Sequence, residues 1–136
     1  MSFVCLVVAG VVRATLPGPE FTLAWTHSVE KTRWEETYRL AGDRLMLVEA
    51  RVEGSGAGME APPGAQLHDG HWVWQPQTTH AELRLARSTY TRDYTLCANG
   101  SCADMSDRLG KPADGEIVSV RSCDGASSPG GEQVRR

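Results

Sequence analysis

The side chains best suited to chemistry lie in one short segment around His27, Ser28 and Glu30, with Glu36 a little further on. Histidine, serine and carboxylates are the groups that nucleophilic catalysis and metal binding use. On an extended strand, neighbouring side chains point to opposite faces, so Ser28 cannot readily use His27 as its base. The local spacing does not make a metal triad either. We expect a hydrogen bond from His27 to Glu36 or to a backbone group, with a direct ligand contact as the alternative and no catalysis.

A glycine-rich segment, Gly54-Ser55-Gly56-Ala57-Gly58-Met59, is the second candidate. It resembles a phosphate loop only superficially, because no helix and no Lys-Ser/Thr pair follow it. Consecutive glycines still expose backbone N–H groups, which together form a small anion-binding nest. The alternative is a bulge or tight crossover after an extended strand.

Alternating segments on either side of His27 predict the strands that must position it. Large side chains alternate with small ones over Phe21–Thr26, and the alternation returns over Trp34–Leu40. A turn at Ala41-Gly42-Asp43 leads into a third strand, Arg44–Glu53. We expect its core face to carry Met46, Val48, Ala50 and Val52. The other face turns from leucine to charged residues, so this strand is expected to leave the core partway along.

The first and third of these strands run parallel in a meander, so their C-terminal ends fall on the same edge of the sheet. That edge is the hypothesised partner or ligand surface, with Trp34 at its rim. The residues assigned to it are His27, Ser28, Glu30, Glu36, Gly56, Ala57, Gly58 and Met59.

The rest of the chain continues the β pattern, with turn signals about every 8–12 residues. Further strands are expected as two within Met1–Leu16, then at His71–Gln75, Thr79–Ser88, Asp93–Cys97, Cys102–Asp104 and Glu116–Ser122. Residues 105–109 offer one turn of helix at most. The expected fold is therefore all-β, a single-domain antiparallel β-sandwich or partly open barrel of about nine short strands. It spans residues 1–123, and the polar segment 124–136 is expected to be a disordered tail.

The 14 basic and 17 acidic residues give a net charge of -3 and are spread along the chain. Binding to nucleic acid is not expected, because it needs a concentrated basic face. The longest apolar run, Phe3–Val12, is shorter than the roughly 18 residues that a transmembrane helix needs. Its many valines favour a strand, with a truncated signal sequence as the alternative.

The chain has four cysteines: Cys5, Cys97, Cys102 and Cys123. Asn99-Gly100 is a strong type I′ hairpin signal, and a two-residue turn there places Cys97 directly opposite Cys102. The Cα separation of such a pair, roughly 4.5 Å, lies within the range of a disulfide. Cys5 and Cys123 belong to the first and last predicted strands. Two disulfides would imply an oxidising compartment and four thiols the cytoplasm, whereas a zinc site is the least favoured reading.

Three sequence segments carry a family resemblance: W-T-H-S-V-E-K-T-R-W-E-E-T-Y-R, then G-S-G-A-G-M, then D-G-H-W. The most specific parts are Thr26-His27-Ser28 with Glu36, and Gly56-Ala57-Gly58-Met59. Together they resemble a small, uncharacterised bacterial family that is typically encoded beside TAXI-type TRAP transporters. Many members carry an N-terminal membrane anchor, whereas this chain begins almost at its first predicted strand.

The resemblance implies an extracytoplasmic β-domain that accompanies solute uptake, without an assigned enzyme activity. Its expected partner is a TRAP transporter subunit or the solute-binding protein, and no cofactor or metal is expected. The alternative function is an independent small-ligand or metal-binding module that uses His27, Glu36 and the Gly56–Met59 loop. A cytoplasmic location remains the alternative to a periplasmic one.

Overall fold

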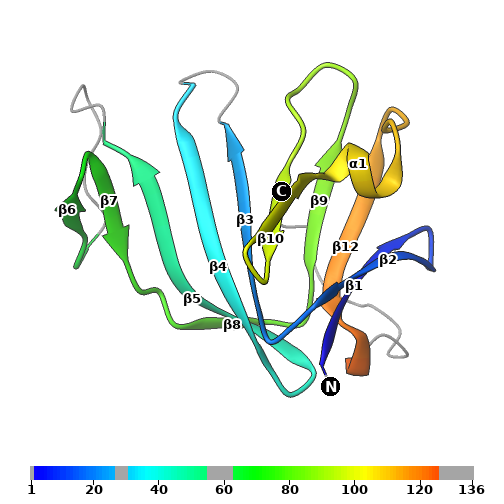
Figure 1. Cartoon of the computed structure of the whole chain (residues 1–136), viewed down its shortest axis with the longest axis horizontal. Helices are drawn as coiled ribbons and strands as arrows, with labels where there is room; N and C mark the ends of the chain where they lie inside the picture. The colour runs from blue at the N-terminus through cyan, green and yellow to red at the C-terminus, as the bar shows by residue number, and fades with distance from the viewer. Residues whose placement is uncertain (1, 27–30, 55–62, 126–136) are drawn as a thin grey trace.

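Two antiparallel β-sheets face each other in the computed structural model, which describes residues 2–26, 31–54 and 63–125 (Figure 1). The smaller sheet contains β1 (Phe3–Val8), β2 (Val11–Pro17), β9 (Leu83–Arg87) and β12 (Glu116–Ser122) in the order β2-β1-β12-β9. The larger sheet has the order β11-β10-β3-β4-β5-β7-β6, with β8 beside β5. Its strands are β3 (Glu20–Thr26), β4 (Arg33–Ala41), β5 (Arg44–Glu53), β6 (Gln66–His68), β7 (His71–Trp74), β8 (Thr78–His80), β10 (Thr95–Ala98) and β11 (Ser101–Asp104).

The core lies between the two sheets and is filled from both. Its fully buried side chains include Leu6 of β1, Phe21 of β3, Tyr38 of β4, Leu85 of β9 and Val118 of β12. These residues follow the period of two that each strand imposes, so each strand contributes one apolar face. The prediction of an all-β sandwich is confirmed, although the described residues form twelve strands rather than about nine.

The segment expected as one strand over Thr79–Ser88 is two strands in different sheets. β8 pairs with β5 of the larger sheet, whereas β9 pairs with β12 of the smaller sheet. The chain crosses from one layer to the other at Ala81-Glu82. Alternation of apolar residues continues through this crossing, and a local pattern cannot tell which sheet a strand joins. The short strand β6 was also missed.

The facing of β5 corrects the sequence prediction. Its register against β4 shifts between Thr37 and Tyr38, which gives β5 one extra residue at a β-bulge. Because side chains alternate along a strand, the extra residue turns the apolar side chains of both halves toward the core. The buried residues of β5 are Leu45, Leu47, Ala50 and Val52. Val52 is fully buried, so the strand does not leave the core partway along.

Both predicted disulfides are formed. Cys97 of β10 lies opposite Cys102 of β11 with a Cα–Cα distance of 4.0 Å, around the Asn99-Gly100 turn. Cys5 of β1 is bonded to Cys123 at a Cα–Cα distance of 5.1 Å. The reading of the cysteines as zinc ligands or free thiols is therefore wrong. Two disulfides are compatible with an extracytoplasmic location.

The chain termini and helices complete the description. The five-residue helix α1 (Met105–Leu109) is the one helical turn that the sequence predicted, and Met105 is buried in the core. A 3-10 turn, η1 (Cys123–Gly125), continues the ordered domain beyond residue 123, and residues 126–136 lie outside the described part. Among the described residues, no helix is long and apolar enough to cross a membrane.

Candidate functional site

The C-terminal ends of β3 and β5 lie at the same edge of the larger sheet, as the sequence predicted. Both strands pair antiparallel with β4, which lies between them, so β3 and β5 run in the same direction (Figure 1). β3 ends at Thr26 and β5 at Glu53, and Arg33 opens β4 opposite Thr26. This edge is therefore where three strand ends come together.

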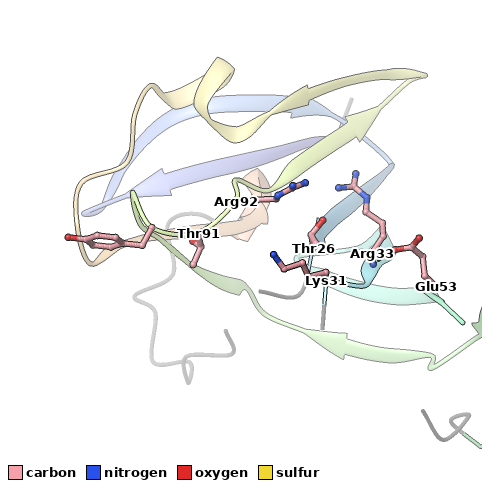
Figure 2. A pocket seen from close by; sticks show the side chains of 7 residues that line it. Thr26, Lys31, Arg33, Glu53, Thr91 and Arg92 are labelled. Atoms are coloured by element: carbon pink, nitrogen blue, oxygen red, sulfur yellow. Dashed lines mark hydrogen bonds between the residues drawn. The ribbon is translucent and has the colours of Figure 1, made fainter. Parts of the chain in front are cut away.

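A pocket of about 570 Å³ opens at this edge, between the strand ends and the loop that joins β9 to β10 (Figure 2). It is lined by Thr26, Lys31, Arg33, Glu53, Tyr90, Thr91 and Arg92. Figure 2 shows the guanidinium groups of Arg33 and Arg92 approaching the same space from the two sides of the pocket. Three cationic side chains and one carboxylate give the lining a charge of +2, in a chain whose net charge is -3.

The sheet side of the pocket is held by cross-strand contacts. The indole rings of Trp25 and Trp34 face each other across β3 and β4 and stack with centroids 6.1 Å apart, next to the Thr26–Arg33 pair. The backbone N–H of Arg33 donates to the Glu53 carboxylate at 2.5 Å, which ties the end of β5 to the start of β4. Aromatic cross-strand pairs of this kind add about 0.5–1.5 kcal/mol each. The position of Arg33 is thus fixed before any ligand arrives.

The loop side of the pocket is anchored by Arg87, a side chain only 1% exposed. Its guanidinium forms ion pairs with Glu116 at 2.7 Å and Asp93 at 3.4 Å, and it donates to the backbone oxygen of Gly110 at 2.8 Å and the hydroxyl of Ser106 at 3.1 Å. Asp93 in turn accepts a hydrogen bond from the Ser106 backbone N–H at 2.5 Å. Because Asp93 directly follows the pocket residue Arg92, this buried network holds the loop where it borders the pocket.

The sequence analysis missed Arg87, although a signal for it existed. Leu83, Leu85 and Arg87 fall on one face of β9 by alternation, and the first two are fully buried. An arginine that continues an apolar face must be buried with its partners, since an isolated buried charge is very costly. The pocket residues Tyr90, Thr91 and Arg92 had no such signal, because they lie in a loop without periodicity.

Glu36 lies on the inner face of the larger sheet rather than in the pocket. It is buried, and its carboxylate accepts a hydrogen bond from the Tyr38 hydroxyl at 2.7 Å. The His80 ring meets Tyr38 edge-on, and its Nε2 lies 3.1 Å from the hydroxyl oxygen of Thr78. Glu36 is therefore part of a buried polar network between β4 and β8, and that network positions strands instead of facing a ligand.

The other predicted site residues cannot be placed. His27, Ser28 and Glu30 lie outside the described residues, and so do Gly56, Ala57, Gly58 and Met59. The proposed pairing of His27 with Glu36 and the proposed glycine nest therefore stay predictions. The structure does describe their flanks, and it brings Thr26, Lys31 and Glu53 together in the pocket.

Gly54 opens the glycine segment, and here the structure gives a packing reason for a glycine. A Cβ atom at Gly54 would lie only 3.0 Å from the indole nitrogen of Trp72. The N–H of Gly54 also donates to the backbone oxygen of Gly70 at 2.7 Å. The glycine therefore lets the end of β5 approach β7 closely, which fits the structural alternative for this one position.

The described part of the chain holds no group of three or more histidine, cysteine or acidic residues with the geometry of a metal site. The pocket lining instead supplies cations and hydroxyl groups. Guanidinium and ammonium groups donate hydrogen bonds and accept none, so this lining suits an oxyanion and not a metal cation.

The model of one protein family, DUF1850, a domain of unknown function, matches residues 21–105. The chain belongs to the DUF1850 family. No protein of curated function and no solved structure matches it.

The DUF1850 match covers every residue that lines the pocket, and it also covers the Cys97–Cys102 disulfide. It runs from β3 to the first residue of α1. Strands β1, β2 and β12 lie outside it, together with both residues of the Cys5–Cys123 disulfide. The pocket therefore belongs to the DUF1850 part of the fold, whereas most of the smaller sheet does not.

Proposed function

We propose that this DUF1850 protein is a non-enzymatic accessory protein of solute uptake, acting beside a TAXI-type TRAP transporter. The proposal is supported by the resemblance of Thr26-His27-Ser28, Glu36 and Gly56–Met59 to the family that is typically encoded beside such transporters. Its partner is a transporter subunit or the solute-binding protein. The working location is the extracytoplasmic side, which the two disulfides favour.

The observation that carries a binding role is the pocket at the edge of the larger sheet. Its lining comes from three strand ends and one loop, and it consists of cations and hydroxyl groups on a rigid support. Binding sites are commonly built from loops that a rigid scaffold positions. The chemistry of these groups is to hold an acceptor-rich partner or ligand.

The experiment is performed in cells that carry the transporter genes and lack the gene for this chain. We expect uptake of the transported solute to fall, and expression of the full chain to restore it. In the same cells, a tagged full chain should cross-link to a TRAP subunit or to the solute-binding protein. Normal uptake in the deletion strain, together with no transporter component in the cross-linked material, would contradict the proposed function.

The second candidate function is an independent small-ligand module at the same edge. It is favoured by one observation, that Thr26 and Glu53 line a common pocket next to the segments that hold His27 and Gly56–Met59. A module of this kind binds its ligand without any transporter component and shows no dependence on a transporter for its phenotype. In the metal-binding form of this alternative, the purified protein carries stoichiometric metal, which elemental analysis measures directly.

A further inference from the structure

We propose that the pocket between the strand ends and the β9–β10 loop binds a small dianion, a molecule with two carboxylates or a phosphoryl group. This inference rests on the proposed binding role and names its ligand class. It assigns the contacts to Lys31, Arg33 and Arg92, with the hydroxyl groups of Thr26 and Thr91 as further donors.

The first argument is that these cations have no anionic partner in the described structure. Within the residues that the structure describes, no carboxylate lies within ion-pair distance of Lys31, Arg33 or Arg92. Glu53 is the one acidic residue in the lining, and its Oε1 accepts from the Arg33 backbone. Like charges gathered in a pocket repel one another, and a bound anion relieves that repulsion.

The second argument is the charge balance of the pocket compared with other hollows. A hollow of about 480 Å³ on the smaller sheet is lined by two arginines and two glutamates, Arg84, Arg121, Glu82 and Glu116, whose charges cancel. A third, of about 320 Å³, contains Lys111 and Asp93, which also cancel. The pocket at the strand ends keeps a charge of +2, which a dianion neutralises.

The third argument is that the donors are held in place. Arg33 lies in the first residue of β4, whose N–H is bonded to Glu53. On the loop side, the hydroxyl oxygens of Ser88 and Thr91 lie 3.2 Å apart, and Asp93 is fixed by α1 and Arg87. Donors fixed in advance lose little conformational entropy on binding.

The size and the donor chemistry point to a small molecule. A volume of about 570 Å³ falls within the range of about 300–1,000 Å³ that small-ligand sites show. Guanidinium groups bind carboxylate and phosphate oxygens in a two-pronged geometry that a singly charged, single-atom ion does not use. The shared chemistry of the ligand is therefore two negative charges on oxygen.

Lys31 adds a backbone observation. Its φ of 59° lies in the left-handed region, which non-glycine residues rarely adopt. Figure 2 shows its ammonium group directed into the space between β3 and the β9–β10 loop. Residues held in such conformations are enriched at ligand-binding positions.

The test is isothermal titration of the purified full chain with malonate and with inorganic phosphate, with acetate as the singly charged control. We expect saturable binding of one or both dianions, weaker at higher ionic strength, and binding of acetate at least about tenfold weaker. The variant Arg33→Gln with Arg92→Gln should lose at least about tenfold in affinity. Arg44→Gln, at the β4–β5 turn on the opposite end of the same sheet, should bind as the wild type does.

Binding of malonate alone assigns dicarboxylates, and binding of phosphate alone assigns phosphoryl compounds; both results support the proposal. Absence of saturable binding by either dianion, equal affinity for acetate, or an equal loss in the Arg44→Gln variant would overturn it. The melting temperature of each variant shows that it is folded. Because the titration needs no transporter, a failed titration leaves the transporter test untouched, and a failed transporter test leaves the titration untouched.

Discussion

Two groups of cationic side chains meet at the β9–β10 loop and differ in every physical respect. Arg87 is buried and has four partners, two of them carboxylates. Lys31, Arg33 and Arg92 line a pocket, and no described carboxylate pairs with them. A charge that the fold itself neutralises contributes to structure, whereas a charge left for solvent is available to a ligand. The comparison separates the support of the site from its working surface.

The covalent link of the support should give the largest effect. Cys5→Ser with Cys123→Ser removes a disulfide that closes 118 residues, so the unfolded chain gains entropy worth about 5 kcal/mol. Cys97→Ser with Cys102→Ser opens a separation of 5 residues and should cost only about 2 kcal/mol. Urea denaturation measures both free energies of unfolding. Equal losses in the two variants would show that loop entropy does not explain the stabilisation.

The buried network should follow closely. Arg87→Met removes the cation and leaves Glu116 and Asp93 facing each other, which should lower the free energy of unfolding by about 3–5 kcal/mol. The control is Arg39→Met, which breaks the exposed pair with Glu20 and should change stability by less than about 1 kcal/mol. If both variants lose the same free energy in urea denaturation, Arg87 is no anchor and the comparison fails.

The pocket cations should have the smallest effect on stability. Arg33→Gln with Arg92→Gln removes two charges that have no described carboxylate partner, so the free energy of unfolding should change by less than about 0.5 kcal/mol, or rise slightly as repulsion falls. Thermal and urea denaturation measure this directly. A loss of 2 kcal/mol or more, on the scale of a buried interaction, would mean that these arginines support the fold.

The sequence predicts those parts of this molecule that depend on local alternation. The strand Arg44–Glu53, the strand Glu116–Ser122 and the Asn99-Gly100 hairpin with its disulfide were all predicted from residues adjacent in the chain. The bulge in β5 and the division of Thr79–Ser88 between two sheets were not, because both depend on the partner strand.

The candidate site was predicted only in part, for a related reason. Strand direction alone placed the ends of β3 and β5 at one edge, and the structure confirms this. The other wall of the pocket comes from Arg92 and its neighbours, whose loop reaches this edge because β9 belongs to the smaller sheet and β10 to the larger. No pattern within the sequence joins Arg33 to Arg92; only the packing of the two layers does.

The most direct test of the central claim, that the pocket is the binding surface of this DUF1850 protein, is a nitrogen-15 amide correlation spectrum recorded during a titration with malonate and with inorganic phosphate. The account predicts that the amides of Thr26, Arg33, Glu53, Thr91 and Arg92 shift together and saturably, whereas those around the β4–β5 turn do not move. Shifts that gather instead around Arg84 and Arg121 on the smaller sheet, or that never saturate, would contradict the account.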